Sequence, residues 1–285
     1  MLPINEFLLW NNCNNNCKFC WQRIEDMSTK EEKLLAIQLV KEYLRDLTNS
    51  HTLFVGGELF CETDPEIVYR LYDLFQFNVS KMLSGELDLC YINTNILYDI
   101  SPLLLPVLTL LEDNGLLHRV HFTTSGDKYG RFTKKSRLLF YKNLQLLRKL
   151  YPDLMIIVNL ILTKDFCEDI LNDKFDLGLY MNQYQIDVNT IPYIKYGDDI
   201  KAPSRELVFK TLYKLDKQAP GYLLKYCNNF LLGQDIILHK YIKGQLIDVT
   251  SRKSMCGHSE NFTLCYSDSD HCFICDCDTI RSTLL

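Results

Sequence analysis

The sequence lacks the features that would place the protein in a membrane, in a secretory route or along a nucleic acid. No apolar run approaches the roughly 20 residues that a bilayer span requires. The N-terminus has no basic segment followed by a long apolar run and a small-residue cleavage site, so no secretory signal is predicted. Acidic residues outnumber basic ones by 36 to 31, which argues against a protein that clamps a polyanion over its whole surface. We therefore expect a cytoplasmic protein, with no membrane partner and with nucleic acid disfavoured as a partner.

Cysteine, in contrast, is abundant. The 285 residues include 12 cysteines, in a chain with 47% hydrophobic and 24% charged residues. That composition is ordinary for a globular protein with a sizeable core, so disulfides are not needed to hold a very small fold together. The cysteines form one group near each end of the chain, and the others are single. Two separate groups suggest two metal sites.

Short β-like runs alternate with longer amphipathic stretches through most of the chain. Several strand candidates are apolar on both faces, as expected for buried parallel strands. Six strand–helix repeats predict an α/β fold with a parallel sheet and right-handed crossovers. The alternation alone does not distinguish an open doubly wound sheet from a partial or closed barrel. The strand candidates are residues 6–10, 52–55, 87–93, 119–124, 154–162 and 184–188, and the helix candidates are residues 28–47, 64–74, 101–111, 134–150, 165–172 and 204–215.

Local signals mark the limits of this pattern. Ser28, followed three residues later by Glu31, has capping-box spacing and predicts the start of the first helix. Beyond residue 217, Pro220 and several glycines divide the chain into shorter segments. We therefore expect a main domain at residues 1–217 and a compact cysteine-rich appendage at residues 218–285.

The first cysteine group directly follows the first strand candidate. Cys13, Cys17 and Cys20 are spaced by four and three residues on an asparagine-rich loop. Three thiolates on one loop can hold three irons of a 4Fe–4S cluster and leave the fourth iron open to a small molecule. The alternatives are a zinc loop without the fourth ligand that zinc usually requires, and three unpaired buried thiols.

This loop resembles the signature of the radical S-adenosylmethionine (radical SAM) superfamily, in which an aromatic residue, here Phe19, precedes the last cysteine and lies close to the adenine. The resemblance covers most of residues 5–217 and implies a partial (β/α)6 barrel of TIM type, with its reaction site at the C-terminal strand ends. It implies that Cys13, Cys17 and Cys20 ligate the cluster and that the amine and carboxylate of SAM chelate the open iron. When the cluster receives one electron, SAM is cleaved and a 5′-deoxyadenosyl radical forms.

The segment Val55-Gly56-Gly57-Glu58, at the end of the second strand candidate, strengthens the resemblance. Radical SAM enzymes have a similar Gly-Gly-Glu segment, which receives the methionyl amine of SAM. Glycines let the main chain approach a ligand closely, and a carboxylate complements an ammonium group. The alternative interpretation is a simple strand-to-helix turn.

Polar residues near the ends of later strand candidates resemble further contacts of this family to SAM. Ser125 can supply a hydroxyl group and Asp127 a carboxylate for hydrogen bonds in the region where this family contacts the ribose and the carboxylate of SAM. Asn159, a polar residue inside an apolar strand candidate, is expected to face SAM. Spacing does not choose between Arg131 and Arg137 for the SAM carboxylate, and Arg137 is the one included in the predicted site. Two weaker candidates of the same kind are Asn93 and Asn95.

The second cysteine group resembles the auxiliary-cluster tails of radical SAM enzymes, called SPASM or twitch domains. Four thiolates complete a closed 4Fe–4S site or a tetrahedral zinc site. The Cys-Asp-Cys spacing is tighter than usual, and with eight residues after Cys277 a full two-cluster domain is not expected. We favour one auxiliary iron–sulfur cluster, whose ligands are Cys256, Cys272, Cys275 and Cys277.

Zinc is the main alternative for this second site, with Cys265, His258 or His271 among its ligands. A disulfide-bonded tail is less favoured in a reducing compartment.

The remaining cysteines are single. Cys61 follows the glycine-rich turn, near the expected mouth of the cavity, and is a candidate to donate a hydrogen atom or to bind substrate. Inert packing is its alternative role. Cys90, Cys167 and Cys227 are expected to pack as small hydrophobic residues.

The leading functional hypothesis is a radical SAM enzyme that abstracts hydrogen from a peptide or protein substrate, because short auxiliary tails are associated with peptide-modifying members. Only twelve residues precede Cys13, so no separate leader-binding domain is expected upstream. The family chemistry implies a one-electron donor of flavodoxin or ferredoxin type. The alternatives are radical modification of a nucleotide or nucleic acid, activation of a glycyl-radical enzyme and, from another class, a non-catalytic protein stapled by zinc.

Overall fold

The computed structural model describes residues 2–18, 28–127, 129–192, 201, 203–222, 235–242 and 244–253. Its centre is one eight-stranded sheet with the strand order β6-β5-β4-β3-β2-β1-β7-β8. All neighbouring strands are parallel except the antiparallel pair β7 and β8. The strands are β1 (Ile4–Leu8), β2 (Ser50–Val55), β3 (Leu87–Asn93), β4 (Val120–Ser125), β5 (Ile156–Leu162), β6 (Asp187–Pro192), β7 (Asp235–Ile242) and β8 (Gln245–Lys253).

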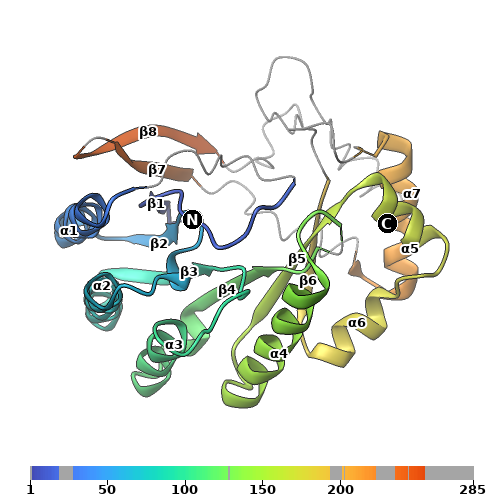
Figure 1. Ribbon diagram of the computed structural model, residues 1–285, viewed down its shortest axis with the longest axis horizontal. Coiled ribbons are helices and arrows are strands. Elements are labelled where there is room, and N and C mark those ends of the chain that lie inside the picture. Colours follow the sequence, from blue (N-terminus) through green and yellow to red (C-terminus); the bar gives the residue numbers. More distant parts are fainter. Residues whose placement is uncertain are drawn as a thin grey trace.

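Helices connect the six strands β1–β6 and lie on the outer side of the arc that these strands form (Figure 1). This arrangement confirms the predicted α/β fold with a parallel sheet, and the open arc is that of a partial barrel. The helices are α1 (Lys30–Asp46), α2 (Pro65–Leu83), α3 (Leu104–Asp113), α4 (Lys134–Leu150), α5 (Lys164–Leu171), α6 (Leu177–Tyr184) and α7 (Arg205–Gln218), with two 3-10 turns, η1 (Leu59–Cys61) and η2 (Leu117–Arg119).

The main hydrophobic core fills the layer between the sheet and its helices. Phe54 of β2 stacks on Phe7 of β1, with ring centroids 5.8 Å apart, and meets Phe75 of α2 edge-on at 5.1 Å. All three rings are buried. Because side chains alternate along a strand, the residues next to Phe54 and Phe7 in their strands point to the opposite, concave face.

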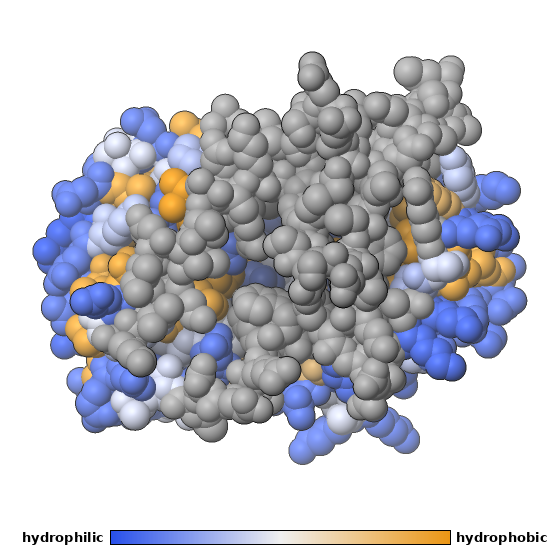
Figure 2. Space-filling model, turned by 90° about the horizontal axis from the view of Figure 1, so that it is seen from above, coloured by the Kyte–Doolittle hydropathy of each residue, from blue (hydrophilic) through white to orange (hydrophobic). Residues whose placement is uncertain are grey.

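The concave face is more polar than the helix-covered face. A small separate apolar cluster of Ile4 and Tyr91 lies on it, and Tyr91 stacks on His121 with centroids 4.8 Å apart. Nearer the C-terminal strand ends, Thr123 Oγ1 donates to Asn93 Oδ1 over 3.2 Å. The concave face thus carries stacked rings in the middle of β3 and β4 and hydrogen-bonding groups nearer the C-terminal ends of these strands. On the described part of the face seen from above, hydrophilic and apolar residues are interspersed at both sides of the molecule (Figure 2).

Strand β7 extends the sheet beyond β1, although its residues are 227 or more positions away in the chain. His239 of β7 stacks on Phe7 at 4.8 Å, and its Nε2 lies 2.8 Å from Asn5 Oδ1. Both side chains of this polar pair are buried. The pair supplies a specific contact at the edge of β1, and β8 then pairs with β7.

The predicted elements agree with the structure in type, but several boundaries move. Residues 87–93 and 134–150 match β3 and α4. The predicted cap Ser28 with Glu31 is wrong by one residue: Thr29 caps α1 and forms the capping box with Glu32. Ser28 instead donates its N–H to Asn12 Oδ1 of the loop after β1, and this bond links the start of α1 to that loop.

Helix α6, the start of β6 and the strands β7 and β8 differ from the sequence-based expectation. Helix α6 was not predicted, and its last residue, Tyr184, was assigned to the sixth strand, which begins at Asp187. Gln185 has a left-handed conformation that ends α6, and only the residues after it extend into β6.

In the described part of the chain, no helix is both long and apolar enough to cross a membrane.

Candidate active site

The loop after β1 is joined through its backbone to the turn after β2. The N–H of Gly57 donates to the carbonyl of Trp10 (2.9 Å), and the N–H of Glu58 donates to the carbonyl of Asn12 (2.8 Å). These bonds continue past the last paired residues of the two parallel strands. The loop that carries Cys13 is therefore fixed by the fold directly against the Gly-Gly-Glu segment.

The close approach of these two segments explains both glycines. A Cβ atom on Gly57 would lie 2.1 Å from the carbonyl oxygen of Asn12 and 2.4 Å from that of Asn11, and one on Gly56 would lie 2.6 Å from that of Trp10. Backbone atoms on both sides leave no room for a side chain. The glycines were predicted to let the main chain approach a ligand; in the structure they let the turn after β2 approach the cysteine loop.

Asparagine side chains connect the cysteine loop to three other segments. Each carboxamide offers both donors and an acceptor, so it can pair with backbone groups that no secondary structure satisfies. The loop is thus held by the segment before α1, the loop after β3 and the loop after β4. The three bonds run from Ser28 N to Asn12 Oδ1 (3.1 Å), from Asn14 Nδ2 to Leu97 O (3.0 Å) and from Asn15 Nδ2 to Arg131 O (3.3 Å).

Two predicted cluster ligands lie on this loop within the described residues. Cys17 is buried and Cys13 is half-buried. Asn15 Nδ2 donates to Cys17 Sγ over 3.4 Å, and Asn95 Nδ2 lies 3.8 Å from Cys13 Sγ. Amide donors directed at both sulfurs suit thiolates that bind a metal, so the residues present fit the predicted cluster.

The other predicted ligands lie outside the described residues. They are Cys20, with its neighbour Phe19, and the C-terminal group Cys256, Cys272, Cys275 and Cys277. Within the described residues, no three His, Cys, Asp or Glu side chains are arranged to hold a metal ion.

Glu58 places a carboxylate in a buried network at the end of β2. Its Oε1 accepts from Thr94 Oγ1 (2.8 Å) and from Phe60 N (3.3 Å), and its Oε2 accepts from Asn95 N (2.6 Å). Tyr98 Oη lies 2.6 Å from Thr94 Oγ1. Only 4% of Glu58 is exposed, and this burial raises the pKa of its carboxyl group from 4.5 to about 7, against the opposing effect of the three hydrogen bonds.

Cys61 lies next to this network, at the end of η1. Its Sγ donates to the carbonyl of Glu58 over 3.2 Å. Burial raises the pKa of the Cys61 thiol to about 12, and the negative charges of Glu58 and Cys13 act in the same direction. At neutral pH Cys61 is therefore a protonated thiol near the cysteine loop.

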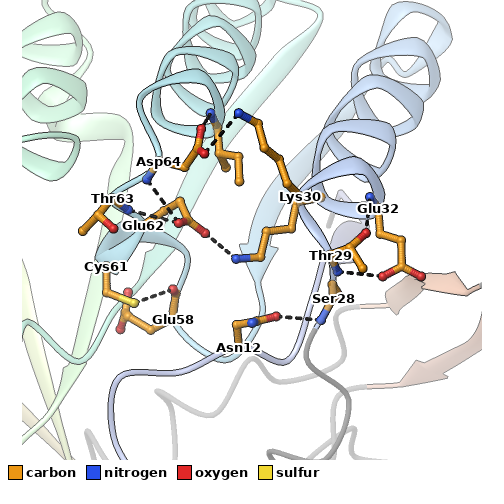
Figure 3. Close-up of polar contacts among 12 residues, drawn as sticks. Asn12, Ser28, Thr29, Lys30, Glu32, Glu58, Cys61, Glu62, Thr63 and Asp64 are labelled. Atoms are coloured by element: carbon orange, nitrogen blue, oxygen red, sulfur yellow. Dashed lines mark hydrogen bonds and ion pairs between the residues drawn. The ribbon is translucent and has the colours of Figure 1, made fainter.

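Ion pairs fix the turn after β2 to the helix that follows the cysteine loop (Figure 3). Lys33 Nζ of α1 lies 2.5 Å from Glu62 Oε2, and both side chains are largely buried. Lys30 Nζ lies 3.1 Å from Asp64 Oδ2, in a more exposed pair. These contacts fix the residues that follow Glu58 and η1 to the start of α1.

A second group of predicted residues lies at the ends of β4 and β5. Ser125 is in register with Asn159, whose Oδ1 accepts from Asn189 Nδ2 of β6 over 3.2 Å. Asp127 is buried, and its carboxylate accepts from the backbone N–H of Ile161. These contacts place three polar side chains in one row across the concave face and use Asp127 to tie β4 to β5.

The structure separates the two candidate arginines. Arg131 Nε donates to Asp127 Oδ2 over 2.8 Å, and the Arg131 carbonyl binds Asn15 of the cysteine loop. The charge of Arg131 also acts on Glu58. Arg137 is exposed in the first turns of α4. Arg131 is therefore the arginine beside the cysteine loop.

Several residues of the site were not identified from the sequence. Thr94, Tyr98 and Lys33 carry no motif, and they join the site only because the fold brings β3 and α1 beside the turn after β2. Asn12, Asn14 and Asn15 did carry a signal, since asparagine is unusually dense around the first two cysteines. Asn95 was a weak candidate, and the structure places its carboxamide against Asn14, with Asn95 Nδ2 2.8 Å from Asn14 Oδ1.

Replacing Gly57 by alanine is expected to separate the two segments, because the new Cβ would overlap backbone atoms of Asn11 and Asn12. We predict that the G57A protein loses most of its bound iron after anaerobic reconstitution, as measured by iron and sulfide content. Gly115→Ala is the matched control, because it strains a positive φ but meets no atom within 4 Å. Full iron content in G57A would contradict the proposed role of the close contact.

The buried carboxyl of Glu58 is expected to make stability depend on pH. Since its pKa in the folded chain, about 7, lies above 4.5, the unfolded chain loses this proton first as the pH rises. The stabilisation is complete below about pH 4.5 and is lost as the pH rises through 7. The total is of the order of 3 kcal/mol.

Denaturant titrations from pH 4.5 to 8 of the unmodified chain and of Glu58→Gln test this. The variant keeps the shape of the protonated side chain but cannot ionise. The fall in its unfolding free energy with rising pH should therefore lack the contribution of Glu58. Parallel curves for the two proteins would show that Glu58 is not the group responsible.

No protein-family model matches the chain, and no curated protein matches it in sequence. Solved structures do match its fold. Native anSMEcpe with bound AdoMet and the Cp18Cys peptide has a TM-score of 0.57 at 13% identity, over 88% of this chain and 77% of that one. Streptococcus suis SuiB bound to S-adenosylmethionine has a TM-score of 0.53 at 13% identity, over 88% of this chain and 63% of that one.

Both proteins are radical SAM enzymes. This chain spans less than two thirds of SuiB, and at 13% identity the likeness is one of fold. The comparison agrees with the topology of β1–β6 and with the barrel that the cysteine loop and the Gly-Gly-Glu segment implied. The chain has the partial (β/α)6 barrel fold of the radical SAM enzymes.

Proposed function

We propose that this protein is a radical SAM enzyme that modifies a peptide or protein substrate. The observation that carries the proposal is the joining of the cysteine loop to Gly57 and Glu58 by two backbone hydrogen bonds. It brings a set of thiol ligands and a buried carboxylate together at the C-terminal strand ends of a barrel with the appropriate fold.

Cys13, Cys17 and Cys20 would hold a 4Fe–4S cluster, with one iron left for SAM. When bound, the reduced cluster supplies the electron that cleaves SAM to a 5′-deoxyadenosyl radical, which abstracts hydrogen from the substrate. The backbone contacts of Gly57 and Glu58 with Trp10 and Asn12 fix the start of the loop, next to the first of these ligands, Cys13.

Gly56, Gly57 and Glu58 would receive the amino group of SAM. The buried Glu58 carboxyl has little water around it, and an ammonium group placed beside it would favour its ionised form. Thr94 Oγ1 and the Asn95 N–H fix the direction of the two carboxylate oxygens. Their role is to position Glu58 in the bound state.

The row of polar side chains on the concave face, at the ends of β4, β5 and β6, would bind the rest of SAM. Ser125 and Asn159 supply hydroxyl and amide groups there, as the family resemblance implies. We assign the SAM carboxylate to Arg131 in place of Arg137, because Arg131 lies beside the cysteine loop and Arg137 is exposed on α4. Asp127 would orient the Arg131 guanidinium through their 2.8 Å contact.

Cys61 would serve as a hydrogen-atom donor or as a substrate contact. Its raised pKa keeps the sulfur–hydrogen bond intact at neutral pH, and an intact S–H bond is the form that can give up a hydrogen atom.

A peptide substrate is supported by the comparison with anSMEcpe, whose structure holds AdoMet and the Cp18Cys peptide together. Cys256, Cys272, Cys275 and Cys277 would form one auxiliary iron–sulfur cluster near that substrate. Zinc is the alternative occupant of this second site. The proposed reaction also needs an external one-electron donor of flavodoxin or ferredoxin type and a reducing compartment such as the cytoplasm.

Anaerobic purification followed by reduction in the presence of SAM tests the proposal. We predict brown protein that forms 5′-deoxyadenosine, and at least a hundredfold loss of this product in Cys13→Ala and Cys17→Ala. Cys167→Ala, which alters a buried thiol of α5, is the control and should retain the activity. Mass or stereochemical change in a co-expressed peptide would then identify the substrate class.

Colourless protein that contains zinc and does not cleave SAM would contradict the proposal. That result would favour a non-catalytic protein in which the two cysteine groups are zinc staples.

A further inference from the structure

Two carboxamides of the described site are directed at the sulfur atoms of the cysteine loop. Asn15 Nδ2 lies 3.4 Å from Cys17 Sγ, and Asn95 Nδ2 lies 3.8 Å from Cys13 Sγ. One donor comes from the cysteine loop and the other from the end of β3, so two different segments supply them. Sulfur is a large, weak acceptor, and donor distances up to about 4 Å are consistent with a contact of this kind.

Neighbouring groups fix the orientation of both carboxamides. Asn15 Oδ1 accepts from Asn16 N over 3.0 Å, and Asn15 Nδ2 also donates to Arg131 O. Exchanging the oxygen and nitrogen of this side chain would place acceptor against acceptor at Arg131 and donor against donor at Asn16. The N–H therefore points to the sulfur of Cys17.

The same argument applies to Asn95. Its Oδ1 accepts from Leu97 N over 2.8 Å, and its Nδ2 donates to Asn14 Oδ1 over 2.8 Å. Asn14 in turn donates to Leu97 O, which sets the orientation of its own carboxamide. The second hydrogen on Asn95 Nδ2 is thus left on the side of Cys13.

We propose that Asn15 and Asn95 are positioning residues that donate N–H···S hydrogen bonds to two cluster ligands and raise the reduction potential of the cluster. This inference rests on the proposed function. Reduction adds negative charge that is shared by the thiolate sulfurs, and a hydrogen bond to such a sulfur stabilises the reduced form more than the oxidised form. The cluster would consequently accept its electron more easily.

The neighbouring asparagines differ in a way that provides a control. Asn15 is half-buried, whereas Asn16 is exposed, and only its backbone N–H takes part in the contacts described above. Asn15→Leu removes the donor at nearly constant side-chain volume. Asn16→Leu makes the same chemical change one residue away, without removing a donor to sulfur.

The test is a redox titration of the reconstituted holoproteins, followed by electron paramagnetic resonance of the reduced cluster. We expect the ratio of reduced to oxidised cluster at a fixed potential to fall roughly three- to tenfold in Asn15→Leu, where tenfold corresponds to a midpoint about 59 mV more negative. Asn16→Leu should match the unmodified protein. Asn95→Leu should shift in the same direction by a smaller amount, because its contact to sulfur is longer.

Equal midpoints in all four proteins, each with a full cluster that responds to SAM, would overturn this inference and leave the proposed function intact. Absence of any SAM-responsive cluster in the unmodified protein would instead refute the proposed function. If Asn15→Leu does not retain iron, Asn95→Leu provides the same measurement. Loss of iron in both variants, with Asn16→Leu unaffected, would overturn the effect on potential and leave the asparagines a structural role alone.

Discussion

The backbone contact between the loop after β1 and the turn after β2 is the constraint on which the rest of the site depends. Two N–H groups of the Gly-Gly-Glu segment donate to two carbonyls of the cysteine loop, and the absence of side chains on Gly56 and Gly57 permits the distance. Such contacts contribute about 1 kcal/mol each in net terms. Their larger effect is geometric, since they fix where the first cysteine lies relative to Glu58.

The environment of Glu58 follows from that contact. The cysteine loop covers one side of the turn, while Lys33 and Lys30 of α1 hold the residues that follow it. The carboxyl group is consequently removed from water and is held by Thr94 and Asn95 at the end of β3. A buried acid with only hydroxyl and amide partners has a raised pKa, and a cationic ligand placed there would reverse this effect.

Much of the fold was predictable because parallel strands buried on both faces appear as apolar runs separated by amphipathic helices. Strand β3 and helix α4 were predicted with their observed bounds. Strands β7 and β8 were not, since the partner of β7 is β1, at the other end of the chain, and local pattern carries no information about that pairing. Helix α6 has a glycine at its second position and contains two tyrosines, residues of lower helix propensity, so its sequence gives a weak helical signal.

The candidate site was predictable where chemistry requires particular residue types at short spacing. The cysteine loop and the Gly-Gly-Glu segment met this condition, although the sequence did not show that the glycines serve the contact between them. Thr94, Tyr98 and Lys33 could not be found in this way, because their roles depend on how the ends of β2 and β3 and the start of α1 meet in space. Spacing also left Arg131 and Arg137 equivalent, and only the packing beside the cysteine loop distinguishes them.

The central claim is that the cysteine loop presents an iron–sulfur cluster with one iron open to SAM. Electron–nuclear double resonance of the reduced holoprotein, with SAM carrying 15N in its methionyl amine, tests this directly. Binding of that amine to the open iron predicts a resolved 15N hyperfine coupling, which disappears when unlabelled SAM is used. A reduced cluster that shows no coupling to the labelled amine at saturating SAM would contradict the account.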